Sequence, residues 1–285
     1  MVFLKAYVSI DIEGLPGIAS TTMIAPGRSQ YNRGTRVMTV IAKEIAVNLL
    51  ENGFERVVIA DSHGLMTNIE YTDMPRGVTL LQGYPRPFSM VLGLDSSYDI
   101  ALFVGYHAAA GTLHGFLDHT MSGRVFHEII VNGNRASEYL INALYAGEKG
   151  VPVVMVAGDE HLREEVHKHT PWCVFVELKR GVSRYAAMYD SFEEVLERIR
   201  NGIQTAINKF KQGEAKPLTI DKPYRVTVRV RDPLIADVLE NISRLKRIDA
   251  YTVEFQVQTA TELLGTIEEI ALIGYGVDAL KTSIR

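Results

Sequence analysis

The chain has 285 residues, of which 47% are hydrophobic and 22% are charged, and its formal net charge is -4. This composition is typical of an ordinary globular protein with one large domain or two modest ones, and it argues against a disordered chain. Because the charge is slightly negative and no Lys/Arg block occurs, we expect neither nucleic acid nor a membrane as a partner and favour a small molecule.

The sequence contains no pattern for export or for a disulfide. Its start, MVFLKAYVSIDIEG, reaches acidic residues too soon for a signal peptide, and no apolar run of about 18 residues follows elsewhere. The single cysteine, Cys173, has apolar neighbours, which favours a buried structural thiol. We therefore expect a cytoplasmic protein without an intrachain disulfide.

Short β-rich runs alternate with helical patterns, which is typical of βαβ units and a largely parallel sheet. Four apolar residues recur at helical spacing between the first two β-rich runs, namely Val37, Ile41, Ile45 and Leu49. We expect strands over residues 5–11, 56–62, 101–106 and 151–159, and helices over residues 33–53, 137–150 and 191–210.

A segment rich in Gly, Lys and Pro, residues 211–223, has the composition of a linker. The patterns that follow it have the order β-α-β-α, over residues 224–230, 233–242, 251–258 and 261–275. The predicted fold class is α/β, with a Rossmann-like, largely parallel sheet and a smaller C-terminal two-layer α/β unit. The predicted domains are residues 1–213, which carry the catalytic and metal-binding residues, and residues 220–285.

Polar residues follow three of the predicted strands at the point where each strand ends. Asp11 and Glu13 end the first strand and, at i and i+2, project to the same face. Two carboxylates so close require a cation between them or a proton on one of them. His63, in ADSHG, and His107, in VGYHA, follow two further strands, and the carboxyl ends of parallel strands converge on one edge.

A further acid, Glu138, lies near the start of a predicted helix. Two imidazoles and three carboxylates form a nitrogen and oxygen ligand set that suits zinc or a similar divalent ion. Each residue alone also has an ordinary interpretation, because DxE and DSHG suit turns or helix caps and His107 suits a strand edge. Their shared position after successive strands is what favours a common site.

The segment from His107 to Glu128 lacks a clear period and holds half of the eight histidines. A loop of this length in a compact domain is typically functional or mobile. We interpret His114 and His127 as residues at the surface or behind the ligands, since no partner for them follows from the sequence.

These residues carry a resemblance to a known family. The motifs SIDIEG, DSHG, GYHA, DHTM and SEYLINALYAG, in this order, resemble the binuclear zinc D-aminopeptidases of the dipeptide-transport-operon (DppA) type. The likeness covers most of the chain and weakens toward the C-terminus. It implies an aminopeptidase that removes an N-terminal residue, such as D-Ala, from short peptides, and a large ring-like homo-oligomer such as a decamer.

Carried over residue by residue, the resemblance implies that Asp11 bridges two zinc ions and that the remaining ligands are Glu13, His63, His107 and Glu138. It also implies that His119, in DHTM, is the catalytic residue, either as nucleophile or as general acid or base. The nearby His114 leaves this last assignment dependent on the HTM motif. Two divalent ions about 3.5 to 4 Å apart would acidify a water and polarise a peptide carbonyl.

Two other classes compete with this interpretation. A nucleotide-binding oxidoreductase is suggested by EGLPGIAS after the first strand, but this segment lacks the GxGxxG spacing and Pro16 interrupts it. A non-catalytic metal-dependent binding or scaffold protein of the same fold is the second alternative. The preference for D-residues and the identity of the metal, zinc or another divalent ion, do not follow from residue patterns.

Overall fold

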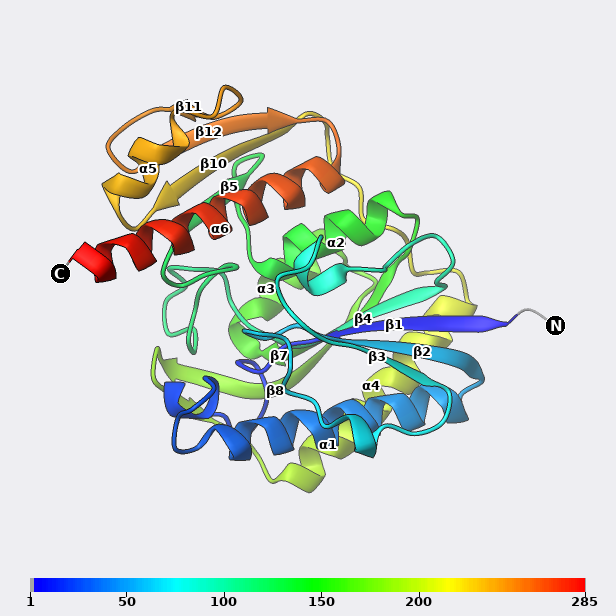
Figure 1. Cartoon of the computed structure of the whole chain (residues 1–285). Coiled ribbons are helices and arrows are strands. Elements are labelled where there is room, and N and C mark those ends of the chain that lie inside the picture. Colours follow the sequence, from blue (N-terminus) through cyan, green and yellow to red (C-terminus); the bar gives the residue numbers. More distant parts are fainter. Residues whose placement is uncertain (1–2, 285) are drawn as a thin grey trace.

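The computed structural model describes residues 3–284, which form two β-sheets with helices packed between and around them (Figure 1). Every neighbouring pair in the larger sheet is parallel except the last one, β8 with β9. Its strands, in spatial order, are β3 (Val78–Leu81), β2 (Phe54–Asp61), β1 (Leu4–Ile10), β4 (Ile100–Tyr106), β7 (Val153–Asp159), β8 (Val174–Ser183) and β9 (Ala186–Met188).

The smaller sheet is antiparallel throughout. Its strands, in spatial order, are β11 (Lys246–Arg247), β12 (Thr252–Val257), β10 (Tyr224–Val230), β5 (Phe126–Val131) and β6 (Asn134–Arg135). It therefore joins C-terminal residues to residues 126–135, which the predicted division counted with the first domain. The division at residues 213 and 220 stays a prediction.

The helices lie in layers on both sides of the larger sheet (Figure 1). One face is covered by α1 (Tyr31–Glu51) and α4 (Phe192–Lys211), and the other by α2 (Glu138–Glu148) and α3 (Arg163–His169). The remaining helices, α5 (Pro233–Leu239) and α6 (Ala260–Ile284), pack on the smaller sheet, and α6 also contacts α2. Short 3-10 turns are η1 (Thr21–Met23), η2 (Tyr71–Asp73), η3 (Ser89–Val91) and η4 (Glu160–Leu162).

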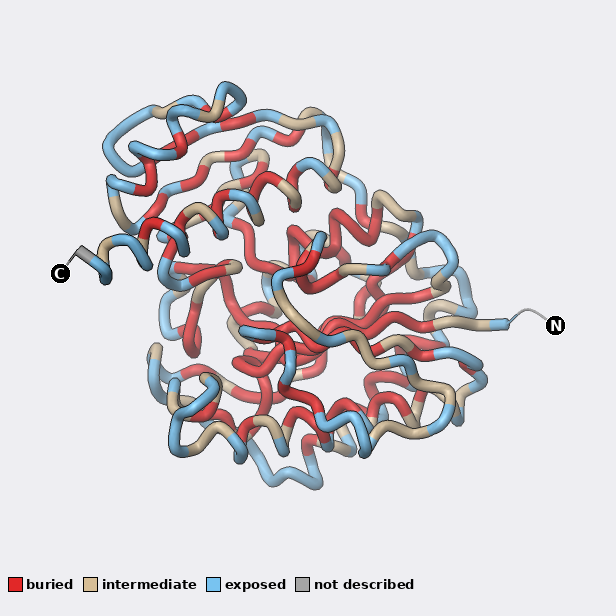
Figure 2. Tube along the Cα trace, in the orientation of Figure 1, coloured by how far each residue is buried: buried red, intermediate tan, exposed pale blue. Residues whose placement is uncertain are grey.

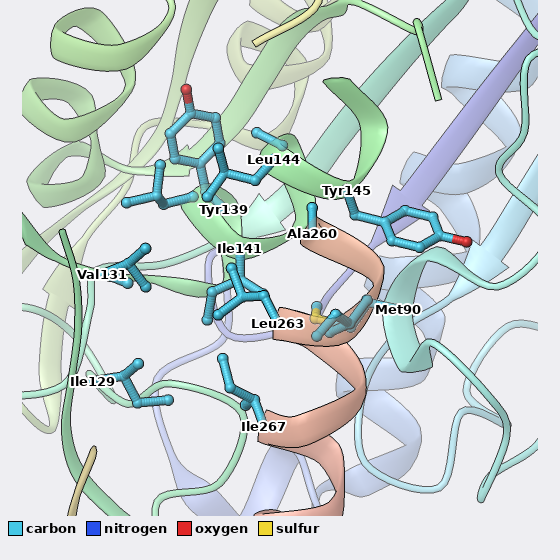
Figure 3. Packing of buried hydrophobic residues seen from close by; sticks show 14 of the residues in the cluster. Met90, Ile129, Val131, Tyr139, Ile141, Leu144, Tyr145, Ala260, Leu263 and Ile267 are labelled. Atoms are coloured by element: carbon cyan, nitrogen blue, oxygen red, sulfur yellow. The ribbon is translucent and has the colours of Figure 1, made fainter. Parts of the chain in front are cut away.

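Two hydrophobic cores hold these layers together. In the first, the inward face of α1 packs against β1, β2 and α4, and its buried residues recur at helical spacing, as at Met38, Ile41 and Ile45. In the second, α2 lies between the two sheets, with Ile141 and Leu144 packed near Leu263 and Ile267 of α6 (Figure 3). Figure 2 shows the buried strands of the larger sheet running through the centre of the molecule.

The expected fold class and the expected order of strands and helices are confirmed, with shifts at the ends of elements. The helix expected over residues 261–275 extends as α6 to Ile284. Six strands were not expected, namely β3, β5, β6, β8, β9 and β11. Among the described residues, no helix has the length and apolar character needed to cross a membrane.

The strand order of the larger sheet places a switch point beside β1. From β1 the chain moves through α1 to β2 on one side, and β4 lies on the other side. At such a point the connections leave in opposite directions, so a crevice opens at the carboxyl ends of the strands. The loops that follow β1, β2 and β4 therefore meet at one edge.

Candidate metal centre

All six residues singled out in the sequence meet at this edge. Asp11 and Glu13 follow β1, His107 follows β4 directly, and each is at most 2% exposed. His63 follows β2, and Glu138 is the first residue of α2, whose N-cap Ser137 accepts a hydrogen bond from the Leu140 amide. His119 comes from the loop between β4 and β5.

One group of ligand atoms surrounds His63. Its Nε2 lies 2.6 Å from the carbonyl oxygen of Ile24, to which it donates. Its Nδ1 faces two carboxylates, 3.2 Å from Asp11 Oδ1 and 2.9 Å from Glu13 Oε2. When His63 is neutral, Nδ1 therefore offers a lone pair to the same point as two carboxylate oxygens.

A second group surrounds His107 in the same manner. Its Nδ1 lies 3.1 Å from the carbonyl oxygen of Ala108, so Nδ1 carries the proton. The opposite nitrogen, Nε2, lies 3.4 Å from Asp11 Oδ2 and 3.6 Å from Glu138 Oε2. Here too an imidazole lone pair and two carboxylate oxygens point toward one another.

The two groups share Asp11, which turns one oxygen toward each. Three of the facing atoms, Asp11 Oδ2, Glu13 Oε2 and His107 Nε2, are buried without a hydrogen-bond partner among the described residues. Ligand atoms about 2.0 to 2.1 Å from a tetrahedral zinc ion lie roughly 3.3 Å apart, which is the scale of the separations in both groups. The residues present therefore fit two divalent ions with Asp11 between them.

Burial and like charge shape the acid–base behaviour of this cluster. Burial raises the pKa of Asp11 well above its usual value, and the neighbouring Glu13 carboxylate adds to that shift. Burial alone would lower the pKa of His63, but the Glu13 charge and the hydrogen bond to Asp11 raise it well above the usual value. The carboxylates thus favour a positive charge among them, which a divalent ion supplies more strongly than a proton.

His119 lies next to this cluster and is less buried than its neighbours. Its ring stacks on that of His107, with centroids 4.3 Å apart, and its side chain is 20% exposed. Nδ1 lies 2.8 Å from the Leu117 carbonyl and donates to it, which leaves Nε2 free to accept a proton 3.7 Å from Glu138 Oε1. This geometry suits a general base and also permits metal ligation, because His107, His119 and Glu138 form a possible ligand group.

A glycine allows β1 and β4 to approach each other closely at the site. Gly105 has a φ of +71°, and the pairing of β4 with β7 shifts register between Val104 and Tyr106. A Cβ atom at Gly105 would lie 2.0 Å from the Asp11 carbonyl oxygen. This irregularity is a bulge of the kind that redirects side chains near active sites, and His107 follows it directly.

The other polar residues of the motifs do not join the cluster. Asp61 turns away and accepts hydrogen bonds from the backbone amides of Asn68 and Ile69, so it fixes the loop after β2. His114 and His127 are exposed, which agrees with their interpretation as surface residues.

Several side chains near the site escaped the sequence reasoning because distant parts of the chain deliver them. Lys179 of β8 is 1% exposed and donates to the carbonyl oxygens of Glu13 and Ile18, both at 2.7 Å, so it fixes the turn that carries Glu13. Burial lowers the pKa of Lys179 to about 7. The only sign of this role in the sequence was a lysine at the end of the largely apolar run VFVELK.

An open cleft leads to the ligand atoms, and its walls come from segments far apart in the sequence. Arg184 and Tyr185, from the turn between β8 and β9, form one wall, and Glu268 and Tyr275 of α6 form another. Arg184 pairs with Asp118 in the histidine-rich loop, which ties that wall to the segment carrying His119. The C-terminal unit therefore shapes the cleft.

Comparisons with known proteins agree with this site. The model of the M55 peptidase family, described as D-aminopeptidase, matches residues 4–269. The chain belongs to this D-aminopeptidase family. A D-aminopeptidase of Bacillus subtilis (strain 168) is 36% identical over 183 residues, which are 64% of this chain and 66% of that protein.

A solved structure of the family has the same fold. It is described as the Zn-dependent D-aminopeptidase DppA from Bacillus subtilis, a self-compartmentalizing protease, and it matches with a TM-score of 0.90 and 28% identity. The match covers 95% of this chain and 98% of that chain. The predicted resemblance is thus confirmed, and the predicted enzyme class, a metal-dependent aminopeptidase, is the class of this family. Neither competing class finds support in these matches.

The position of Asp11 in this D-aminopeptidase fold leads to a test by metal analysis. We expect Asp11→Asn to lose most of both zinc ions, because it removes the negative charge between them and replaces one oxygen with an amide nitrogen that cannot serve as a ligand. Elemental analysis of zinc-loaded, desalted protein measures the content. Two ions retained per chain would exclude the shared role of Asp11.

Asp61→Asn is the matched control, since it makes the same change of carboxylate to amide at the end of the neighbouring strand. It should keep the zinc content of the wild type. Its melting temperature should fall, because the backbone amides of Asn68 and Ile69 lose a charged acceptor.

Proposed function

We propose that this chain is a metal-dependent aminopeptidase that hydrolyses the N-terminal residue, a D-amino acid such as D-Ala, from short peptides or amides. Two zinc ions would be held by Asp11, Glu13, His63, His107 and Glu138, with Asp11 shared. His119 would be the catalytic residue. The names of the related proteins support the reaction and the preference for D-residues.

One observation carries the proposal. Asp11 directs its two oxygens to two separate imidazole nitrogens, and each pair is completed by a further carboxylate, Glu13 or Glu138. A single ion would leave one of these groups with buried acceptors facing one another. Two ions sharing Asp11 satisfy both groups.

The chain's own groups account for proton transfer. Bound divalent ions supply an acidified water and a polarised peptide carbonyl. His119, whose Nδ1 donates to the Leu117 carbonyl, presents Nε2 to the cleft as the proton acceptor. Its exposed fraction of 20% leaves it accessible to substrate, whereas His107 behind it is 1% exposed and suits a ligand. The same Nε2 can return the proton to the departing amine.

The cleft supports a small substrate. It opens between the turn after β8 and helix α6, and both tyrosine and arginine side chains line it. A free amino terminus is a cation, and the carboxylates around His63 and Glu138 attract it. The arginines at the rim suit the carboxylate at the other end of a short peptide.

We extend the proposal to assembly. The related structure is described as a self-compartmentalizing protease, and we propose that this chain also forms a large closed ring such as a decamer. Apolar side chains exposed on and beside the edge strand β9 support a contact with a second copy: Val182 is 47% exposed, Tyr185 62% and Met188 56%. The cytoplasmic location stays a prediction.

A substrate panel tests the reaction. Metal-free protein is reconstituted with zinc, manganese or cobalt and assayed on matched D- and L-aminoacyl amides and on dipeptides that begin with D-Ala or L-Ala. We expect turnover of the D-substrates with a free amino terminus and none of the N-acetylated forms. Stoichiometric zinc without turnover of any substrate would favour the non-catalytic alternative.

Two histidine variants test the catalytic assignment. His119→Asn should keep two zinc ions while turnover falls by about 10²-fold or more, the scale for losing a positioned acid or base. His114→Asn is the control, because asparagine tolerates the φ of +62° found at His114, and its turnover should stay near the wild-type value. Loss of zinc in His119→Asn would indicate that His119 is a ligand instead. An inactive His114→Asn that keeps its zinc would assign the catalytic role to His114.

Light scattering tests the assembly. We expect a mass many times the 31.8 kDa of one chain, and a lower mass for Met188→Asp, which places a charge on the exposed edge strand. Val40→Asp, on the exposed side of α1, is the control and should leave the mass unchanged. A monomer at micromolar concentration would contradict the proposed ring and would leave the proposed metal site unaffected.

A further inference from the structure

Behind the candidate ligands lies a second, fully polar cluster that the reaction does not use. Ser62 Oγ lies 2.8 Å from Ser9 Oγ, Ser9 Oγ lies 2.8 Å from the Tyr106 hydroxyl, and Asn142 Nδ2 lies 3.0 Å from that hydroxyl. We call these four residues the Ser9 network. Ser9, Tyr106 and Asn142 are 0% exposed and Ser62 is 5% exposed.

Each member of the Ser9 network is a near neighbour of a different ligand. Ser9 precedes Asp11 by two residues in an extended segment, so both side chains leave on the same face. Asn142 follows Glu138 by four residues on α2, which places both on one side of the helix. Ser62 and Tyr106 precede the two histidine ligands directly.

Counting protons gives the network one direction. Ser62 has one hydroxyl proton, which it donates to the carbonyl oxygen of Ala60 at 3.0 Å or of Met90 at 3.2 Å. When Ser62 donates to a carbonyl, it accepts from Ser9, and Ser9 accepts from Tyr106; this order gives every hydroxyl proton an acceptor. Tyr106 then accepts from the amide of Asn142. The donors run from α2 through β4 and β1 to the end of β2 without a break.

The network has few alternative partners: Ser62 has its two carbonyl acceptors, and Asn142 Nδ2 has one other contact, the sulfur of Met90 at 3.3 Å. Asn142 Oδ1 has no hydrogen-bond partner among the described residues, so Nδ2 alone orients this amide. Removing one hydroxyl leaves two neighbours unsatisfied in a buried place, and hydrogen bonds in such a chain strengthen one another. A displacement at one strand is thereby opposed by the other three elements.

We propose that the Ser9 network is a positioning device that locks β1, β2, β4 and α2 together so that their ligands stand at metal-binding distance. Ligands must be held within about 0.5 Å of a productive geometry, and the ligand loops begin where the strand ladders end. The hydrogen bonds of the Ser9 network link these elements at the ends of the strands, where the ligand loops begin. Its residues are positioning residues, since they act through the ligands beside them and Ser9, Tyr106 and Asn142 are fully buried.

The inference rests on the proposed metal centre, and zinc affinity measured by competition with a chelator tests both. Tyr106→Phe removes only the central hydroxyl, because its ring keeps the stacking on Phe103. We expect zinc affinity to fall by about 10-fold or more, within the usual range for losing a group that orients metal ligands. Ser9→Ala is a second variant with a smaller change of volume, and it should show the same loss.

Tyr139→Phe is the matched control. Like Tyr106, Tyr139 is 0% exposed. It lies on α2, and its hydroxyl lies 2.6 Å from Thr170 Oγ1, away from the ligands. Both tyrosine variants should lower the melting temperature of the metal-free protein, but only Tyr106→Phe should weaken zinc binding. The absorption spectrum of the cobalt-substituted protein should change in Tyr106→Phe and stay constant in Tyr139→Phe.

The outcomes separate the two proposals. If Tyr106→Phe and Ser9→Ala bind zinc as tightly as the wild type while their melting temperatures fall like that of Tyr139→Phe, the network only stabilises the fold and the inference is wrong. If the wild type itself binds no zinc tightly, the proposed metal centre is wrong instead.

Discussion

The crowding of three carboxylates at one edge of the larger sheet is the constraint on which the site depends. Asp11, Glu13 and Glu138 are all at most 4% exposed, and none of them pairs with a lysine or arginine side chain among the described residues. Buried acids in such a place destabilise a fold unless positive charge stands among them. Three features of the surrounding protein hold these acids in place: a bulge at Gly105, the buried Lys179 behind Glu13, and the Ser9 network beneath the candidate ligands.

Much of this arrangement could be predicted from the sequence because it depends on local patterns. The apolar periodicity of α1 and the strand-like runs around it predict a parallel sheet, and the topology of such sheets brings Asp11, His63 and His107 to one edge. Glu138 was found because it lies near the start of a predicted helix, where a carboxylate suits the helix dipole. The structure brings all these residues together, while their roles as ligands and that of His119 as catalytic residue stay predictions.

The remaining features depend on pairings that no local pattern records. The strand β5 is short and follows an irregular loop, and its partner β10 lies about a hundred residues further along the chain. Arg184 and Tyr185 enter the cleft because a hairpin closes the edge of the sheet, and Glu268 enters because α6 packs on α2. In each case a tertiary contact decides the position, and the sequence shows only a charged or aromatic residue of ordinary kind.

Helix α6 makes one wall of the cleft depend on residues far along the chain from the candidate ligands. The candidate ligands and His119 all lie before residue 140, whereas this wall belongs to a helix of 25 residues that begins at Ala260. That helix also covers apolar residues of α2 and the smaller sheet, such as Ile141 and Val131. A chain with α6 displaced from α2 would lose this wall of the cleft, although the candidate ligands come from other elements. The groove for a substrate and the candidate metal site are therefore built from separate parts of the fold.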